Sequence, residues 1–111
     1  MSCIFCQIIK KEIPAQIVYE DDGILAFKDI RPKAKTHFLV ISKEHIPSLN
    51  EVKNQEILGK LLWQTKILAE NFSLDKTGYK IIINSGEGAG QVVFHLHLHL
   101  LGGDELKDFN V

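Results

Sequence analysis

Three histidines alternate with leucines near the C-terminus, and their types and spacing suit them to chemistry. The segment 94–101 reads FHLHLHLL. Side chains in a strand alternate between its two faces, so a strand places His95, His97 and His99 together on one face. Phe94 and the alternating leucines then fall on the other face, against the core. A row of three imidazoles is uncommon for purely structural histidines, and it predicts a functional site.

Two kinds of chemistry suit such a row. In the first, His-x-His places two imidazoles on one metal ion, with a third ligand from elsewhere. In the second, a neutral imidazole attacks phosphorus. Its ordinary pKa of about 6.5 keeps it nucleophilic near neutral pH, and a neighbour holding its other nitrogen can orient it. Flanking histidines, if protonated, stabilise charge on phosphate oxygens and the leaving group.

The preceding loop favours chemistry on phosphorus. Residues 85–91 read SGEGAGQ and lead directly into the histidine segment. Glycines allow main-chain N–H groups to approach an anion closely. Asp29, predicted to end a strand, is suited to accept hydrogen bonds from ribose hydroxyls, although a plain turn aspartate is the competing interpretation. A metal-dependent hydrolase built on His95, His97 and His99 is disfavoured, because no carboxylate stands beside them on that strand as a general base.

The rest of the chain supplies the elements that must position these residues. Hydrophobic periodicity predicts a short helix over 3–11, ended by Pro14, and one long helix from about 54 to 71. Alternating runs predict strands over 16–20, 24–29, 37–42, 79–84 and 92–101. The order β-β-β-α-β-β, with hairpin-length connections at each end, predicts an α+β fold: an antiparallel sheet packed on the long helix.

Composition limits the class of protein. The 111 residues, 45% hydrophobic and 24% charged, suit a single domain over 1–111. The formal net charge of −1 argues against a broad nucleic-acid or membrane surface. We see no apolar run of membrane-spanning length and no signal peptide, and the two cysteines are too close in sequence for a useful structural disulfide. We therefore expect a cytoplasmic protein in a reducing compartment.

The segment 95–101 matches the signature His-φ-His-φ-His-φ-φ of the histidine-triad (HIT) family. The chain resembles the Hint branch of that family over nearly its whole length, from Ile4-Phe5 through 36–46 to Gly102-Gly103. The resemblance implies a small α+β fold that usually pairs into a homodimer with a continuous sheet. It also implies binding of purine nucleoside monophosphate derivatives, and a phosphoramidase or nucleotide hydrolase activity at the α-phosphate through a nucleotidyl-histidine intermediate.

The resemblance also implies roles for individual residues. His97 resembles the nucleophile, the main-chain carbonyl of His95 would orient it, and His99 and His37 would contact phosphate and assist the leaving group. Asp29 would hold the ribose hydroxyls. The base pocket would be lined by Phe27, Ile30 and Leu39, and the phosphate and ribose would be flanked by Asn84, Gly90, Gln91 and Val93.

A structural zinc ion is a further expectation. Cys3-x-x-Cys6 supplies at most two ligands, whereas a structural zinc needs four. The resemblance implies that His45 and His95 complete the set, and that the metal tethers the N-terminal segment rather than taking part in the reaction. The alternative is that both cysteines are simply small apolar residues on a short helix.

Two departures from the Hint pattern bear on specificity. Val92 stands where close relatives often carry a serine able to donate a hydrogen bond near the bond that is cleaved. The tail from Asp104 to Val111 lacks the Trp-Pro ending of the eukaryotic type, and this tail helps to shape the substrate entrance. A second hypothesis, from another class, is a nucleotide-binding sensor or scaffold protein whose catalysis is incidental.

Overall fold

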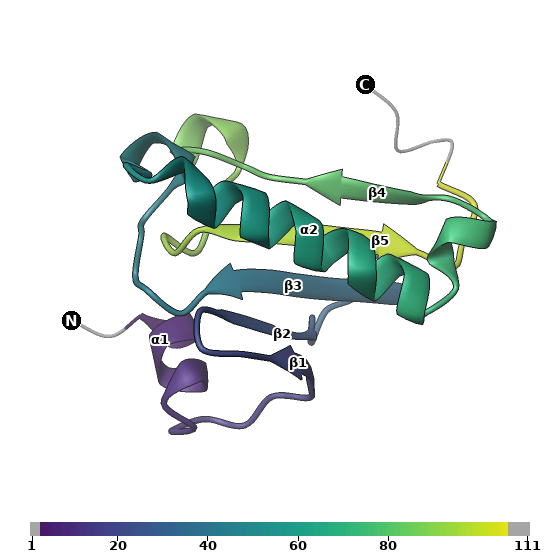
Figure 1. Cartoon of the computed structure of the whole chain (residues 1–111), viewed down its shortest axis with the longest axis horizontal. Helices are drawn as coiled ribbons and strands as arrows, with labels where there is room; N and C mark the ends of the chain where they lie inside the picture. The colour runs from purple at the N-terminus through teal and green to yellow at the C-terminus, as the bar shows by residue number, and fades with distance from the viewer. Residues whose placement is uncertain (1–2, 107–111) are drawn as a thin grey trace.

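The computed structural model describes residues 3–106, in which a five-stranded antiparallel sheet carries a long helix on one face (Figure 1). This confirms the predicted α+β class. The tail residues 107–111, to which part of the specificity prediction refers, lie outside the described residues. The strands β1 to β5 lie in the order β1-β2-β3-β5-β4, and the elements are α1 Ile4–Ile9, β1 Ile17–Glu20, β2 Ile24–Lys28, β3 Thr36–Ser42, α2 Gln55–Asn71, β4 Tyr79–Ile82 and β5 His97–Gly102.

Helix α2 covers the front of the sheet in the view of Figure 1. It begins where the Asn54 side chain accepts a hydrogen bond from the Glu56 N–H at 2.9 Å, a standard N-cap. Leu61 and Leu68 face the sheet and are fully buried, which stabilises the fold by about 1.5–3 kcal/mol for each side chain. The sheet residues that contact this core are Ile24, Ala26, Phe38, Val40, Leu98 and Leu100.

The opposite face of the sheet is covered in part by the short helix α1. Phe5 and Ile8 of α1 are buried against strand residues that alternate with those facing α2, namely Leu25, Phe27, Leu39 and Ile41. Alternate side chains of these strands therefore pack into two separate cores, one on each face of the sheet. The face opposite α2 is the one that carries the histidines, as the strand register shows.

Strand β5 lies between β3 and β4 and brings His97 and His99 to this second face. His97 pairs with Ile41 of β3, and His99 pairs with Leu39. Directly paired residues in an antiparallel ladder project from the same face. The two histidines therefore project away from α2, beside the core that α1 covers.

The prediction of a strand over 92–101 is wrong at its beginning. The strand starts at His97, and residues 83–96 form a long connection rather than a hairpin. The Gln91 side chain bonds to the Pro47 carbonyl at 2.7 Å, and the Leu96 N–H donates to the Ile46 carbonyl at 2.6 Å. These bonds hold the segment against residues 46–47 instead of against β4. Phe94, predicted to be buried, is 44% exposed for the same reason.

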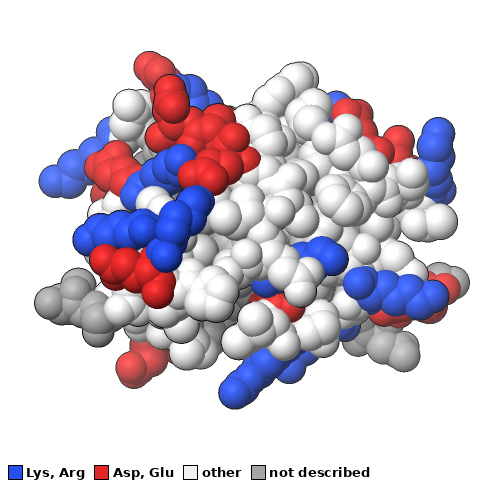
Figure 2. All heavy atoms as spheres, turned by 90° about the horizontal axis from the view of Figure 1, so that it is seen from below, with Lys and Arg blue, Asp and Glu red and all other residues white. Residues whose placement is uncertain are grey.

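In the part of the chain that the structure describes, the connections between these elements contain three short 3-10 helices. Single 3-10 turns occupy Leu49–Glu51, Leu74–Lys76 and Glu87–Ala89. Among the described residues, no helix combines the length and the apolar character needed to cross a bilayer. In Figure 2, which views the molecule from below, basic and acidic side chains intermingle around a broad uncharged area. That face therefore presents no continuous basic stripe.

Candidate active site

The His97 imidazole is held by a main-chain carbonyl. Its Nδ1 lies 2.6 Å from the carbonyl oxygen of His95. A carbonyl only accepts, so Nδ1 carries the proton and Nε2 keeps its lone pair. The ring is 8% exposed and lies edge-on to Phe5, with ring centroids 5.2 Å apart. Burial lowers the pKa of His97 below its ordinary value, despite the opposing bond to the His95 carbonyl. The arrangement therefore leaves a neutral imidazole with the lone pair of Nε2 unprotonated.

Beside His97 lies a cluster formed by His99, His37 and Asp29. His37 Nε2 is 3.0 Å from His99 Nδ1 and 3.5 Å from an Asp29 carboxylate oxygen. Burial, with the neighbouring His97 and His37, lowers the pKa of His99 to about 4. Burial also lowers the pKa of His37, although the Asp29 charge opposes this. These histidines are thus neutral near pH 7.

Asp29 follows the end of β2, close to its predicted position. Its Oδ1 accepts a hydrogen bond from the Arg31 N–H at 2.8 Å, which bends the chain away from the strand. Its Oδ2 remains directed towards His37. The side chain is 19% exposed, so the carboxylate is partly accessible to solvent beside the histidines.

A second cluster brings together the four predicted metal ligands. His95 Nδ1 lies 3.2 Å from His45 Nδ1 and 3.4 Å from Cys3 Sγ, and Cys6 Sγ lies 3.3 Å from His45 Nδ1. Both cysteines are free thiols. Around a tetrahedral zinc ion, two ligand nitrogens lie about 3.3 Å apart, and a nitrogen and a sulfur about 3.5 Å apart. The donor atoms therefore already have the separations that a metal ion requires.

The other nitrogen of His95 supports this interpretation. His95 Nε2 lies 2.6 Å from the Ser42 carbonyl oxygen and must donate to it. This leaves the Nδ1 lone pair facing the two cysteines, and metal-bound histidines commonly donate their second N–H in this manner. Burial and the adjacent Cys3 raise the pKa of the Cys6 thiol. A bound cation would supply the positive charge that favours the thiolate.

The predicted base-pocket residues are divided between the core and the surface. Phe27 and Leu39 are 4% and 6% exposed and belong to the core under α1, against which Val93 also packs. Ile30, by contrast, is 87% exposed. The fold brings Phe27, Leu39 and Val93 together. Ile30 instead projects from the loop after β2.

The predicted phosphate-side residues lie in the long connection. Gln91 is buried; its amide nitrogen donates to the Pro47 and Val93 carbonyls, and its oxygen accepts from the Gly86 N–H. Both amide N–H groups of Gln91 are therefore used within the protein, where they shape the loop. Gly90 has a φ of 90°, a conformation that favours glycine. Asn84 is half-buried at the start of this connection.

Sequence reasoning missed three contributors to the site. Phe5 contacts the His97 ring, the Ser42 carbonyl holds His95, and the Lys33 N–H donates to His37 Nδ1 at 3.1 Å. The apolar side of the first helix was a signal for Phe5. The other two act through main-chain atoms, which leave no trace in residue type.

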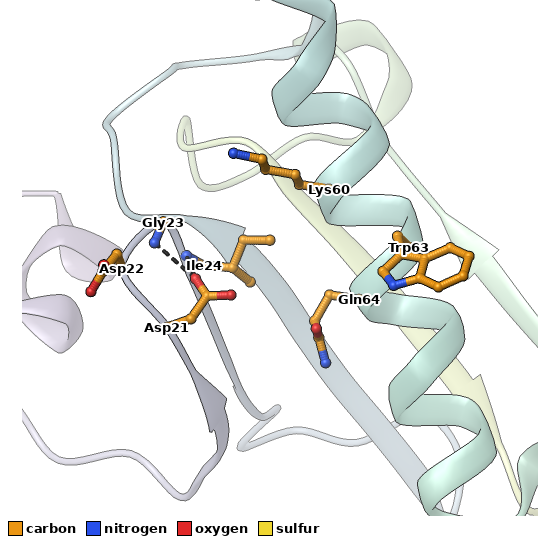
Figure 3. Close-up of a pocket in the computed structure, with 7 residues that line it drawn as sticks. All are labelled: Asp21, Asp22, Gly23, Ile24, Lys60, Trp63 and Gln64. Atoms are coloured by element: carbon orange, nitrogen blue, oxygen red, sulfur yellow. Dashed lines mark hydrogen bonds between the residues drawn. The ribbon is translucent and has the colours of Figure 1, made fainter.

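A separate hollow of about 380 Å³ lies on the other side of the sheet, between α2 and the β1–β2 turn (Figure 3). Trp63 borders it and is 62% exposed, and the other lining residues are Asp21, Asp22, Gly23, Ile24, Lys60 and Gln64. The Asp21 carboxylate accepts from the Gly23 and Ile24 N–H groups and is committed to the turn. No histidine or cysteine lines this hollow, so the histidine face is the better candidate for catalysis.

The chain matches a protein-family model over most of its length. The HIT domain family model matches residues 10–106. The chain is 48% identical over 103 residues to protein HitA of Neisseria gonorrhoeae, covering 91% of this chain and 95% of that protein. It is 43% identical over 105 residues to the purine nucleoside phosphoramidase of Escherichia coli, covering 93% of this chain and 88% of that protein.

A solved structure gives the same result. The HIT family hydrolase from Legionella pneumophila superposes with a TM-score of 0.92 and 47% sequence identity, covering 96% of each chain. Fold and sequence thus agree over nearly the entire length. The chain belongs to the histidine-triad (HIT) family.

Proposed function

We propose that this protein is a purine nucleoside phosphoramidase, or a closely related nucleotide hydrolase, that acts at the α-phosphate. The observation that carries the proposal is the 2.6 Å bond between His97 Nδ1 and the His95 carbonyl, which presents the Nε2 lone pair of a buried neutral imidazole. The 43% identity to a protein named purine nucleoside phosphoramidase supports the choice of substrate.

The reaction proceeds in two displacements at phosphorus. His97 Nε2 attacks the α-phosphorus and forms a nucleotidyl-histidine, while the P–N bond to the leaving nitrogen breaks; that nitrogen keeps the electron pair, takes a proton from solvent and departs as a neutral amine. Water then attacks the same phosphorus and gives a proton to solvent. The bond between phosphorus and Nε2 breaks, its electron pair returns to His97, and the nucleoside monophosphate and the neutral imidazole are released. The positive charge developing on His97 is stabilised by the His95 carbonyl.

The neighbouring residues bind the substrate in this proposal. The partly exposed Asp29 carboxylate accepts from the ribose hydroxyls, and His99 contacts the phosphate. The Gly90 and Gln91 segment and Asn84 flank the phosphate and ribose. Phe27 and Leu39 provide an apolar wall for the purine, and exposed Ile30 covers its outer side, while Val93 lies beside the phosphate and ribose.

We also propose a structural zinc ion held by Cys3, Cys6, His45 and His95. The fit of donor types and separations supports it. The ion would hold α1, and so Phe5, against the His97 ring, and it would fix the residue whose carbonyl orients the nucleophile. It takes no part in bond breaking.

A homodimer completes the proposal. Within residues 3–106, β4 is an edge strand of the sheet, paired with β5 alone. A second copy adding to this edge would form the continuous sheet that the family resemblance implies, because an open strand edge is a template for pairing.

The test measures AMP release from adenosine 5′-phosphoramidate by wild type and by His97→Ala at neutral pH. We expect release by wild type, loss of more than about 10⁴-fold in the variant, and retained AMP binding. Lys66→Ala, in helix α2 on the opposite face of the sheet, is the control and should keep wild-type activity. Turnover retained by His97→Ala rules out the mechanism, whereas tight nucleotide binding without wild-type turnover supports a nucleotide sensor or scaffold protein.

A further inference from the structure

Both ring nitrogens of His37 are engaged within the protein. The Lys33 main-chain N–H donates to Nδ1 at 3.1 Å. A main-chain N–H can only donate, so Nδ1 must offer its lone pair. The neutral His37 ring therefore carries its proton on Nε2. The side chain is 3% exposed, which leaves the ring little access to a bound ligand.

The His37 proton points to His99. Nε2 of His37 lies 3.0 Å from His99 Nδ1, a normal hydrogen-bond distance, but 3.5 Å from the Asp29 carboxylate. Since His37 donates, His99 Nδ1 accepts. The neutral His99 ring then carries its own proton on Nε2, the nitrogen that faces away from His37.

We infer that the Lys33 main-chain amide and His37 together fix the tautomer of His99, so that His37 is a positioning residue and His99 a neutral Nε2–H donor. The use of this donor on the phosphoryl group rests on the proposed function, but the tautomer itself does not. His37 then acts through His99 and has no direct contact with phosphate.

The inference explains how two histidines two residues apart take opposite roles. The Nδ1–H of His97 donates a hydrogen bond to a carbonyl, and its Nε2 presents a lone pair. The Nδ1 of His99 accepts a hydrogen bond from His37, and its Nε2 presents an N–H. The two ring centroids are 5.0 Å apart. One ring is therefore suited to attack phosphorus while its neighbour donates to a phosphoryl oxygen.

Two alternative states of this cluster are disfavoured by the same hydrogen bonds. Asp29, His37 and His99 have ligand atoms within 4.8 Å of one another, as a metal site requires. A metal on His37 Nε2, however, would displace the proton while Nδ1 is occupied by an N–H donor, leaving an anionic ring. Protonation of His99 at Nδ1 would place its N–H directly against the N–H at His37 Nε2, which is unfavourable. The lowered pKa of His99 agrees with this.

Nuclear magnetic resonance of the ¹⁵N-labelled protein tests the inference directly, because the two ring nitrogens of each neutral histidine differ in shift according to which carries the proton. Signals are assigned from single histidine variants. We expect a protonated Nε2 in His37 and His99, and a protonated Nδ1 in His97. A protonated Nδ1 on His99 in wild type overturns the inference.

Two matched pairs test the direction of the relay. His37→Gln keeps an N–H donor close to the Nε2 position and should retain the His99 tautomer, whereas His37→Leu removes the donor and should shift it towards Nδ1. Lys33→Pro removes the main-chain N–H and should shift both rings, whereas Lys33→Ala keeps it. An unchanged His99 tautomer in His37→Leu contradicts the inference, and the Lys33 pair decides the matter if His37→Leu does not fold.

Phosphoramidate turnover gives the second readout. His37→Leu should lower kcat by roughly 10²-fold with little change in KM, because a lost transition-state donor affects the chemical step, and His37→Gln should recover most of that loss. Equal losses in both variants contradict a positioning role. Wild type without turnover overturns the proposed function alone, since the tautomer measurement is independent of activity.

Discussion

At the scale of single residues, burial determines the charge state of the histidine cluster. His37, His97 and His99 all have lowered pKa values, and desolvation is the largest cause in each case. A cationic imidazole would lose both its hydration and one of the hydrogen bonds just described. The folded state therefore keeps these imidazoles neutral at lower pH than the unfolded chain does.

The stability of the protein should fall between pH 6.5 and 4. The unfolded His99 side chain binds a proton near its ordinary pKa of about 6.5, while the folded one remains neutral down to a pKa of about 4. The unfolded state thus binds more protons in this window, and the contribution of His99 is present above pH 6.5 and lost as the pH falls. The loss is about 3 kcal/mol at most, measured by urea unfolding at several pH values.

His99→Asn serves as the control for this titration. The variant should lose part of the dependence on pH between 6.5 and 4, because a titrating group has been removed. An identical slope for wild type and variant would show that His99 does not titrate as described.

The sequence predicted that the histidines lie close together, but the spacing did not show that His95 belongs to a different cluster from His97 and His99. The prediction that His97 and His99 share one face is correct. Alternation of side chains is a local property of a strand, so it can be predicted without knowing which strands are neighbours. His95 lies before β5, buried against the cysteines, and joins the reactive site only through its carbonyl. The family resemblance predicted both roles of His95, while the spacing alone predicted three equivalent imidazoles.

At the scale of elements, α1 depends on a tether. The helix has six residues and buries only Phe5 and Ile8, too little for such a short segment to be stable by itself. A further attachment is the cluster of Cys3, Cys6, His45 and His95. Metal binding would therefore stabilise α1 more than any other element.

Removal of metal should destabilise the protein more than it inhibits it. We expect a chelator to lower Tm by about 5–10 °C, equivalent to one or two kcal/mol, while AMP release at 25 °C falls only a few-fold. Cys6→Ser should show the lower Tm without chelator and no further shift with it. A Tm that is the same for wild type with and without chelator would contradict a structural metal.

The long connection before β5 should depend on Gln91. Gln91→Leu leaves the Gly86 N–H and the Pro47 and Val93 carbonyls without their partner, which should cost about 2–4 kcal/mol of unfolding free energy. Gln55→Leu, at an exposed position of α2, provides the matched control and should change stability little. Equal effects of the two substitutions would contradict the role described for Gln91.

This connection also marks the limit of element prediction. Residues 92–101 have strand-like residue types throughout, so local preference gives no reason to begin the strand at His97. The boundary is set by tertiary bonds from Gln91 to Pro47 and from Leu96 to Ile46, whose partners lie more than forty residues away in sequence. Local patterns identify strands, but distant partners decide where they pair.

At the scale of the whole molecule, the sheet separates the helix that forms the main core from the face that carries the histidine cluster. Helix α2 covers one face, and α1 with the histidines occupies the other. The α+β class and the antiparallel sheet were predictable from the order of elements. The strand order β1-β2-β3-β5-β4 was not, because the insertion of β5 beside β3 is a long-range pairing.

The open β4 edge should determine the oligomeric state. Light scattering should give twice the mass of the single chain for wild type. Ile83→Lys, at a 38% exposed position directly after β4, should shift the protein towards monomer, because a charge at an apolar edge opposes strand addition. Lys66→Ala should remain dimeric. A monomeric wild type would contradict the proposed dimer.

The use of main-chain atoms to place the histidine protons has a consequence for mutational tolerance. The Ser42 carbonyl, the His95 carbonyl and the Lys33 amide do this work, and almost any residue supplies the same atoms. Saturation mutagenesis at Lys33 should thus find nearly every side chain acceptable and proline alone excluded. The acid–base character of the site can be kept while the side chains around it vary, which leaves the surrounding surface open to redesign for new substrates.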